Sequence, residues 1–134
     1  MYAIVPAAGS GTRMGDILSG RSKTLLALPG DQTILGLTLW ALVQSGVFSG
    51  VIVVSRAEDL TEVREVAAKE LAGILFSVVQ GGSNRQRSVL NGLEAVPPGI
   101  KHVAIHDAAR PFCSAPMFVK VAAVAVETGS AILA

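Results

Sequence analysis

Short apolar runs alternate with segments of helical periodicity along the whole chain. The apolar runs predict strands over residues 2–5, 51–55, 75–80 and 102–106. Hydrophobic positions spaced as on one helical face predict helices over residues 33–44, 60–71, 83–95 and 116–128. Turn residues separate these elements, among them Gly46 after the first helix and Pro97-Pro98-Gly99 after the third.

This alternation predicts the fold class. Strands joined by helices form right-handed crossovers, so we expect one α/β domain over residues 1–134. Its fold would be Rossmann-like, with an open, mostly parallel sheet and helices on both faces. The composition agrees, because 51% of residues are hydrophobic and only 4% are aromatic, as suits a parallel sheet buried on both faces. The chain stops within an apolar run at residues 130–134, so we expect a domain truncated at its C-terminus.

Charge and cysteine content narrow the function classes. A formal net charge of +1 gives no electrostatic footprint for nucleic acid or for an anionic membrane. The apolar N-terminal run is too short for a signal peptide or a membrane span. Cys113 is the single cysteine, which excludes an internal disulfide and a cysteine metal cluster. We therefore expect a cytoplasmic protein whose partners are neither nucleic acid nor membrane.

Candidate chemistry follows three of the four predicted strands. Residues 6–15 form a glycine-rich loop with Arg13, residues 81–88 begin with two glycines, and residues 106–111 carry Asp107. In an open α/β sheet, ligands bind beyond the carboxyl ends of the strands. Glycines, cations and a carboxylate are therefore predicted to meet at one edge of the sheet.

The first loop has the character of a phosphate-binding loop. Ala7, Ala8, Gly9 and Gly11 have little or no side chain, so backbone amides can approach an anion closely. Arg13 adds a fork of donors suited to phosphate oxygens. A plain turn between strand and helix needs only one glycine, and so explains this pattern less well.

Two familiar glycine loops fit poorly. A dinucleotide fingerprint needs a small residue where Met14 stands, and an acidic residue at the end of the second strand, where Ser55 stands. A P-loop needs glycine directly before Lys23, and this chain has Ser22 there. An NAD-dependent oxidoreductase domain is therefore disfavoured.

The three loops together resemble a known family. Residues 6–14, with the sequence PAAGSGTRM, followed by Lys23, resemble the opening of the sugar-nucleotide pyrophosphorylase superfamily. Residues 81–89 (GGSNRQRSV) and 106–111 (HDAARP) are similar to the 2-C-methyl-D-erythritol 4-phosphate cytidylyltransferase family of non-mevalonate isoprenoid biosynthesis. The resemblance covers the whole chain, which corresponds to somewhat more than the first half of such an enzyme. Ribitol-5-phosphate cytidylyltransferases are the nearest alternative, but Ala8 and Ala109 stand where that group tends to have glycine and valine.

The resemblance implies substrates and residue roles. CMP would pass from CTP to 2-C-methyl-D-erythritol 4-phosphate, and pyrophosphate would be released. Arg13 and Lys23 would be catalytic, with Arg21 as the alternative loop cation, and Asp107 would bind Mg²⁺. The implied nucleotide-binding residues are Pro6, Ala7, Ala8, Gly9, Ser10, Gly11, Thr12, Gly81, Gly82, Arg85, Ser88, Ala108 and Arg110.

Some expectations depart from the family pattern or are purely structural. The family usually has proline before the loop lysine, and this chain has Ser22. The family's second half supplies the acceptor site, a second acidic metal ligand and a dimerisation arm. We therefore expect a homodimeric parent enzyme and an isolated chain that turns nothing over; a non-catalytic nucleotide-binding domain is the alternative. We expect a structural hydrogen bond from His106, and a solvated helix face carrying Asp59.

Overall fold

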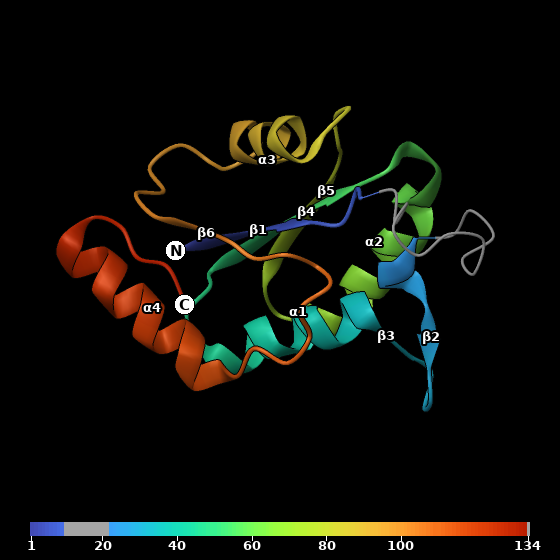
Figure 1. Ribbon diagram of the computed structural model, residues 1–134, viewed down its shortest axis with the longest axis horizontal. Helices are drawn as coiled ribbons and strands as arrows, with labels where there is room; N and C mark the ends of the chain where they lie inside the picture. Colours follow the sequence, from blue (N-terminus) through green and yellow to red (C-terminus); the bar gives the residue numbers. More distant parts are fainter. Residues whose placement is uncertain (10–21, 134) are drawn as a thin grey trace.

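Four parallel strands form the centre of the molecule (Figure 1). The computed structural model describes residues 1–9 and 22–133. The sheet order is β5–β4–β1–β6, with strands β1 (Tyr2–Pro6), β4 (Gly50–Ser55), β5 (Leu75–Gln80) and β6 (Val103–Ile105). All four predicted strands and their parallel pairing are confirmed. The chain adds β4 and β5 on one side of β1 and then crosses to place β6 on the other side.

Helices cover both faces of this sheet, as the sequence predicts. Helices α1 (Ile34–Ser45), α2 (Leu60–Glu70) and α4 (Ala115–Thr128) lie on one face, and α3 (Arg85–Glu94) lies on the other (Figure 1). Helix α1 packs against α2 and α4, while α3 packs against β1 and β4. None of the helices in the described part of the chain has the length and apolar character required to span a bilayer.

Capping residues set the helix boundaries. The hydroxyl of Thr33 accepts a hydrogen bond from the amide of Gly36 at the start of α1, and Gly46 ends that helix at φ 65°. The side chain of Asn84 accepts from the amide of Arg87, so α3 begins at Arg85, two residues later than predicted.

The core lies between β1, β4 and the helices on either side. Leu35, Leu39 and Leu42 of α1 are almost completely buried against one face of the sheet. On the other face α3 comes very close, because Gly92 has no side chain. A Cβ atom at Gly92 would lie 2.6 Å from Cγ2 of Ile4. Burial of these aliphatic side chains supplies the main driving force for folding.

Burial of the sheet on both faces holds only for its central strands. Strand β4 is buried at every position, but Leu75 of β5 is 71% exposed and Ile105 of β6 is 47% exposed. These two strands form the edges of the sheet. The composition-based prediction was therefore wrong for the edges, because composition averages over the strands and cannot tell central ones from outer ones.

Local features absent from the sequence prediction lie outside the central sheet. Strands β2 (Ala27–Leu28) and β3 (Gln32–Thr33) form a small antiparallel hairpin, and 3-10 turns span Lys23–Leu25 and Ala57–Asp59. Strands of this length show no hydrophobic periodicity. Asp59 was also wrongly placed in solvent: it is buried, and its carboxylate lies 2.6 Å from Nε of Arg56, which offsets the cost of burying its charge.

Candidate functional site

A pocket of about 730 Å³ opens at the carboxyl edge of the sheet, where the loops after β1, β5 and β6 meet. Its lining consists of Pro6, Ala7, Ala8, Gly9, Lys23, Thr24, Gly82, Ser83, Asn84, Arg85, Ser88, Asp107, Ala108, Ala109 and Arg110. The fold therefore brings together the three loops that the sequence singled out.

All but one of the predicted site residues in the described part of the chain line this pocket. The exception is Gly81. The predicted residues Ser10, Gly11, Thr12, Arg13 and Arg21 lie outside the described residues.

Gly81 instead allows two loops to approach each other. Its amide donates to the carbonyl of Ser55 at 2.7 Å, which extends the hydrogen bonding between β4 and β5. A Cβ atom at Gly81 would lie 2.6 Å from Cβ of Ala8. The absence of a side chain thus lets the loop after β5 lie against the loop after β1, and Gly81 shapes the pocket from behind.

Ser88 holds the loop between β5 and α3. Its side chain is buried and donates to the carbonyl of Asn84 at 2.9 Å, while the amide of Gly82 donates to the Ser88 hydroxyl at 3.1 Å. A serine in the first turn of a helix commonly bonds to nearby backbone in this way. These contacts fix the path of residues 82–88 along the pocket wall.

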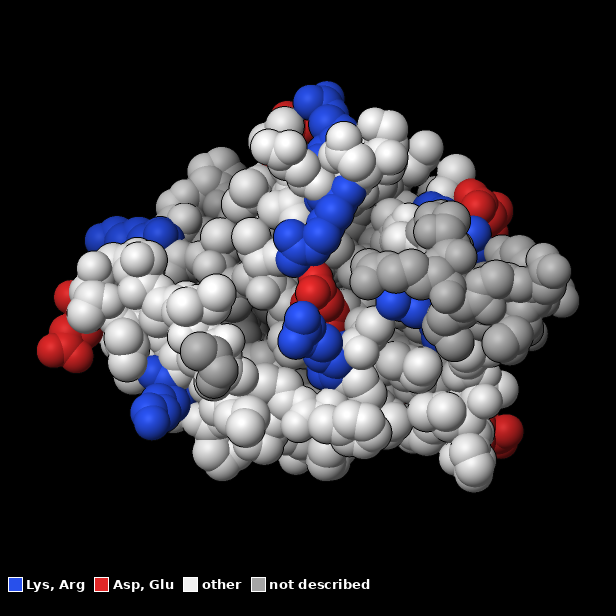
Figure 2. Space-filling model, viewed as in Figure 1, with Lys and Arg blue, Asp and Glu red and all other residues white. Residues whose placement is uncertain are grey.

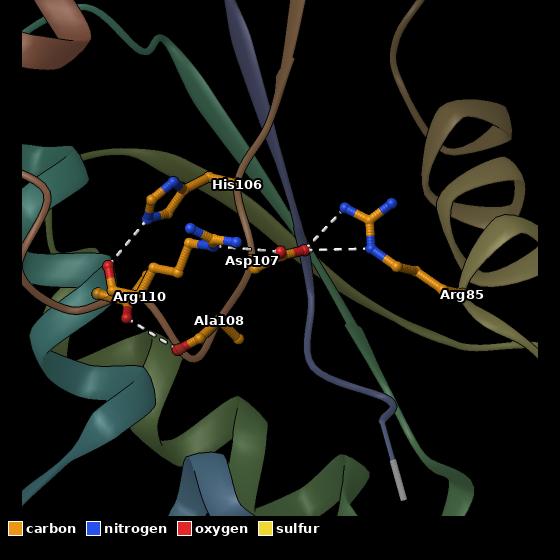
Figure 3. A network of polar contacts seen from close by, with 6 residues as sticks. Arg85, His106, Asp107, Ala108 and Arg110 are labelled. Atoms are coloured by element: carbon orange, nitrogen blue, oxygen red, sulfur yellow. Dashed lines mark hydrogen bonds and ion pairs between the residues drawn. The ribbon is translucent and has the colours of Figure 1, made fainter. Parts of the chain in front are cut away.

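Asp107 lies between two arginines from different parts of the chain (Figure 3). Nε and Nη2 of Arg85 lie 3.2 Å and 2.8 Å from Oδ1 of Asp107, and Nε of Arg110 lies 3.4 Å from Oδ2. Figure 2 shows an acidic side chain between basic ones near the centre of this face of the molecule. Two guanidinium groups and one carboxylate leave a local excess of positive charge, which favours an anionic ligand.

The arginines keep Asp107 ionised. Partial burial by itself raises the pKa of the Asp107 carboxyl group, but the hydrogen bonds and charges of Arg85 and Arg110 together outweigh it, so that the pKa lies below its ordinary value. The side chain is therefore a carboxylate at neutral pH and can serve as an oxygen ligand to a cation.

The loop that carries Asp107 is fixed to the rest of the fold at several points. The hydroxyl of Thr38, on α1, donates to the carbonyl oxygen of Ala108 at 2.9 Å, and the amide of Ala108 donates to the carbonyl of Pro6. Both Thr38 and Ala108 are fully buried. The turn after β6 is thereby held by α1 on one side and by the end of β1 on the other.

His106 supports the same turn. Its Nε2 lies 3.1 Å from the carbonyl oxygen of Arg110, and its ring packs edge-on against Phe118 of α4 at 5.0 Å between centroids. Burial lowers the pKa of His106, and this effect is larger than that of the hydrogen bond to Arg110, which raises the pKa. The expected structural hydrogen bond is confirmed.

The pocket residues suit a divalent cation only if a bound ligand supplies most of its oxygen ligands. Among the residues that the structure describes, Asp107 is the single acidic residue that lines the pocket, and no group of three or more His, Cys, Asp or Glu could hold a metal ion. Mg²⁺ commonly binds through one or two carboxylates together with substrate phosphates and water. The donor set fits such a phosphate-held cation and does not form a cage made by protein alone.

Sequence reasoning missed two residues that organise the site. Asn84 caps α3 and accepts the Ser88 hydroxyl hydrogen bond, and an asparagine just before a predicted helix was a usable signal for that cap. Thr38 stands within an apolar helix. Its contact with Ala108 spans 70 residues, so no local pattern could reveal it.

Comparisons with known proteins agree with the resemblance seen in the sequence. A family model described as IspD: 2-C-methyl-D-erythritol 4-phosphate cytidylyltransferase matches residues 1–134. The 2-C-methyl-D-erythritol 4-phosphate cytidylyltransferase of Microcystis aeruginosa is 40% identical over 123 residues, which cover 92% of this chain and 53% of the relative. The protein of the same name from Solibacter usitatus is 40% identical over 133 residues, covering 97% and 54% of the two chains.

A solved structure gives the same result for the fold. The 4-diphosphocytidyl-2C-methyl-D-erythritol synthase from Anaerococcus prevotii superposes with a TM-score of 0.76 and 26% identity, over 95% of this chain and 51% of that one. The chain thus spans about half the length of the relatives it matches. Because the family model matches every residue from 1 to 134, the chain belongs to the 2-C-methyl-D-erythritol 4-phosphate cytidylyltransferase family.

Proposed function

We propose that this chain is the nucleotide-binding part of an enzyme that transfers CMP from CTP to 2-C-methyl-D-erythritol 4-phosphate and releases pyrophosphate. Family membership supports the reaction, and one structural observation supports the site. A single pocket at the carboxyl edge of the sheet combines small-residue loops, the cations Lys23, Arg85 and Arg110, and the carboxylate of Asp107. A cytoplasmic homodimer is part of the same proposal.

The pocket residues divide into two groups in this proposal. The small residues of the loops after β1 and β5 would leave room for the nucleotide and offer it backbone groups; they are Pro6, Ala7, Ala8, Gly9 and Gly82. Lys23 and Arg110 would hold phosphate oxygens. For Ser10, Gly11, Thr12 and the catalytic Arg13, the proposal rests on the family motif in residues 6–14.

The proposed reaction is an in-line substitution at phosphorus. An oxygen of the acceptor's phosphate attacks the α-phosphorus of CTP, and the bond to the bridging oxygen breaks, so that pyrophosphate leaves with the electron pair. Such transfers depend on positioning and on electrostatic stabilisation, and they need no covalent enzyme intermediate. Lys23 would hold the phosphate oxygens as charge shifts toward the leaving group.

A divalent cation, which we propose to be Mg²⁺, would be held by Asp107 and by nucleotide phosphates. The cation would supply further neutralisation of phosphate charge. Asp107 provides the one carboxylate that this mode of binding needs. Its position, fixed through Ala108 and Thr38, suits a group that must meet the nucleotide at a defined place.

Pyrophosphate release by a protein that extends to the relatives' full length tests this proposal. The wild-type protein should release pyrophosphate with CTP and 2-C-methyl-D-erythritol 4-phosphate, and more slowly with other nucleotides or with ribitol 5-phosphate. Asp107→Asn should lower kcat/KM by roughly a hundredfold or more, as expected for the loss of a group that stabilises charge in the transition state.

Asp31→Asn is the matched control, because it makes the same chemical change in the β2–β3 turn, where asparagine tolerates the positive φ of 54°. Its activity should equal that of the wild type. Equal activity of Asp107→Asn and the wild type, or no CTP-dependent release at all, would overturn the proposal.

A further inference from the structure

Both carboxylate oxygens of Asp107 are occupied by guanidinium groups. Arg85 contacts Oδ1 with two nitrogens, the shorter contact being 2.8 Å, and Arg110 contacts Oδ2 at 3.4 Å. The Asp107 side chain is only 35% exposed, whereas those of Arg85 and Arg110 are 64% and 74% exposed. A cation that reaches the carboxylate therefore competes with both arginines for its oxygens.

Arg85 is the stronger and the more distant of the two partners. It reaches Asp107 from the first turn of α3, 22 residues away in the chain, whereas Arg110 belongs to the same turn as Asp107. Both of its nitrogens share the single oxygen Oδ1, the shorter contact at 2.8 Å is well within hydrogen-bond distance, and arginine stays charged throughout the ordinary pH range. Arg85 therefore competes with a cation for Oδ1 whenever Asp107 is ionised.

The position of Arg85 at the start of α3 also favours contact between its guanidinium and a phosphate. A cation in the first turn of a helix opposes the positive end of the helix dipole unless an anion lies close by. Asp107 is that anion for Arg85. A phosphate group in the same pocket carries more negative charge than a carboxylate, and so offers the guanidinium a better partner at the same helix end.

Charge makes the free site unfavourable for a cation on its own. Two guanidiniums and one carboxylate carry a net charge of +1 (2 − 1), so a lone divalent cation meets a positive cluster. A triphosphate reverses this sign, because its oxygens neutralise the arginines and also ligate the cation.

We infer that Arg85 makes cation binding at Asp107 dependent on the nucleotide: it covers the carboxylate in the free protein and releases it when phosphate draws the guanidinium away. Arg85 is then a positioning residue that orders binding. The inference rests on the proposed function for the identity of the nucleotide, but not for the behaviour of the cation alone.

Binding of Mn²⁺ as a spectroscopic probe tests this role without any assay of activity. Free Mn²⁺ is measured by electron paramagnetic resonance in titrations of the chain, first alone and then with CTP. Wild-type protein should bind Mn²⁺ weakly alone and more tightly with CTP. Arg85→Gln should bind Mn²⁺ alone about three- to tenfold more tightly than the wild type, the range expected for loss of a partly exposed, two-nitrogen ion pair.

Arg87→Gln is the matched control, because it removes the same charge from the same turn of α3, and its backbone amide bond to Asn84 stays in place. It should match the wild type. Arg85→Lys, which keeps the charge and loses the fork, should fall between the wild type and Arg85→Gln. Thermal unfolding of each variant checks that the fold is intact.

The outcomes separate the two proposals. If Arg85→Gln without CTP binds Mn²⁺ no more tightly than the wild type does, the proposed role of Arg85 is overturned. CTP that binds but leaves the Mn²⁺ affinity of the wild type unchanged would overturn it as well. Failure of CTP to bind, seen in its phosphorus resonances, would count against the proposed function, and the comparison without nucleotide would still decide the role of Arg85.

Discussion

Single residues around the pocket either fix its loops or carry its charge. Ser88 and Thr38 use buried hydroxyl groups to fix the loops, while Lys23 and Asp107 bring charge to the surface that those loops enclose. A buried hydroxyl contributes about 1 kcal/mol to stability through its hydrogen bond, and leaving its partner unpaired costs more. The charged residues add little stability where they are exposed, so a ligand is the better explanation for their convergence.

His106 should make stability depend on pH in a defined direction. Its folded-state pKa is lowered, chiefly by burial, so the unfolded chain binds more protons at this residue. The contribution of neutral His106 is complete above the unfolded pKa of about 6.5, and it is lost as the pH falls from there through the folded pKa. In urea unfolding of the wild type, the free energy of unfolding should therefore decrease as the pH is lowered from about 7.5 to about 5.5.

The variant His106→Gln carries no titrating group at this position and serves as the comparison. Its free energy of unfolding should fall less steeply over the same interval. Equal slopes in the two proteins would show that His106 is not held in its neutral form by burial.

Helices and strands were largely predictable because their signals are local. Gly46 and the spacing of apolar residues in 33–44 fixed α1, and Leu75–Gln80 was found with its observed bounds. The hairpin of β2 and β3 was missed, because strands of two residues show no period. The exposure of Ile105 was missed as well, since an edge strand and a central strand have similar apolar sequences.

The site was predictable only as a set of loops. The rule that ligands bind beyond the carboxyl ends of parallel strands was enough to bring residues 6–9, 81–88 and 106–111 together. The pairing of Arg85 with Asp107 and the support of Ala108 by Thr38 depend on tertiary contacts between distant parts of the chain. Such pairings require the relative positions of helices, which hydrophobic patterns do not give.

Gly92 tests how closely α3 must pack on the sheet. Gly92→Ala would gain up to about 1 kcal/mol from helix propensity. The added Cβ, however, would lie 2.6 Å from Cγ2 of Ile4 and 3.0 Å from Cγ2 of Val54, and such overpacking costs about 1–3 kcal/mol. The second effect should win, with a net loss of about 1–2 kcal/mol in urea unfolding.

Gln86→Ala is the control for this substitution, because Gln86 is exposed in the first turn of the same helix. Its free energy of unfolding should stay within about 0.5 kcal/mol of the wild type. A Gly92→Ala protein that is more stable than the wild type would mean that α3 lies farther from β1 and β4 than the structure places it.

At the scale of the whole molecule, the polar pocket and the mostly apolar hollow adjoin each other. The polar pocket lies where β1, β5 and β6 end, whereas a mostly apolar hollow of about 1020 Å³ runs along β6 and α4. Arg85, Asp107 and Arg110 line both. The charged cluster therefore stands at the boundary between the proposed nucleotide site and the open side of the sheet.

The most direct test is an amide NMR titration of this chain with Mg²⁺ and CTP, with GTP and NAD as controls. CTP should shift the amides of Gly82, Ser83, Ala108 and Arg110 in a saturable manner, and it should leave Leu75, at the opposite end of the sheet, unchanged. Arg110→Gln should weaken this binding. Shifts of equal size with GTP or NAD, or CTP shifts that do not gather at the carboxyl edge, would contradict the assignment of this pocket to CTP.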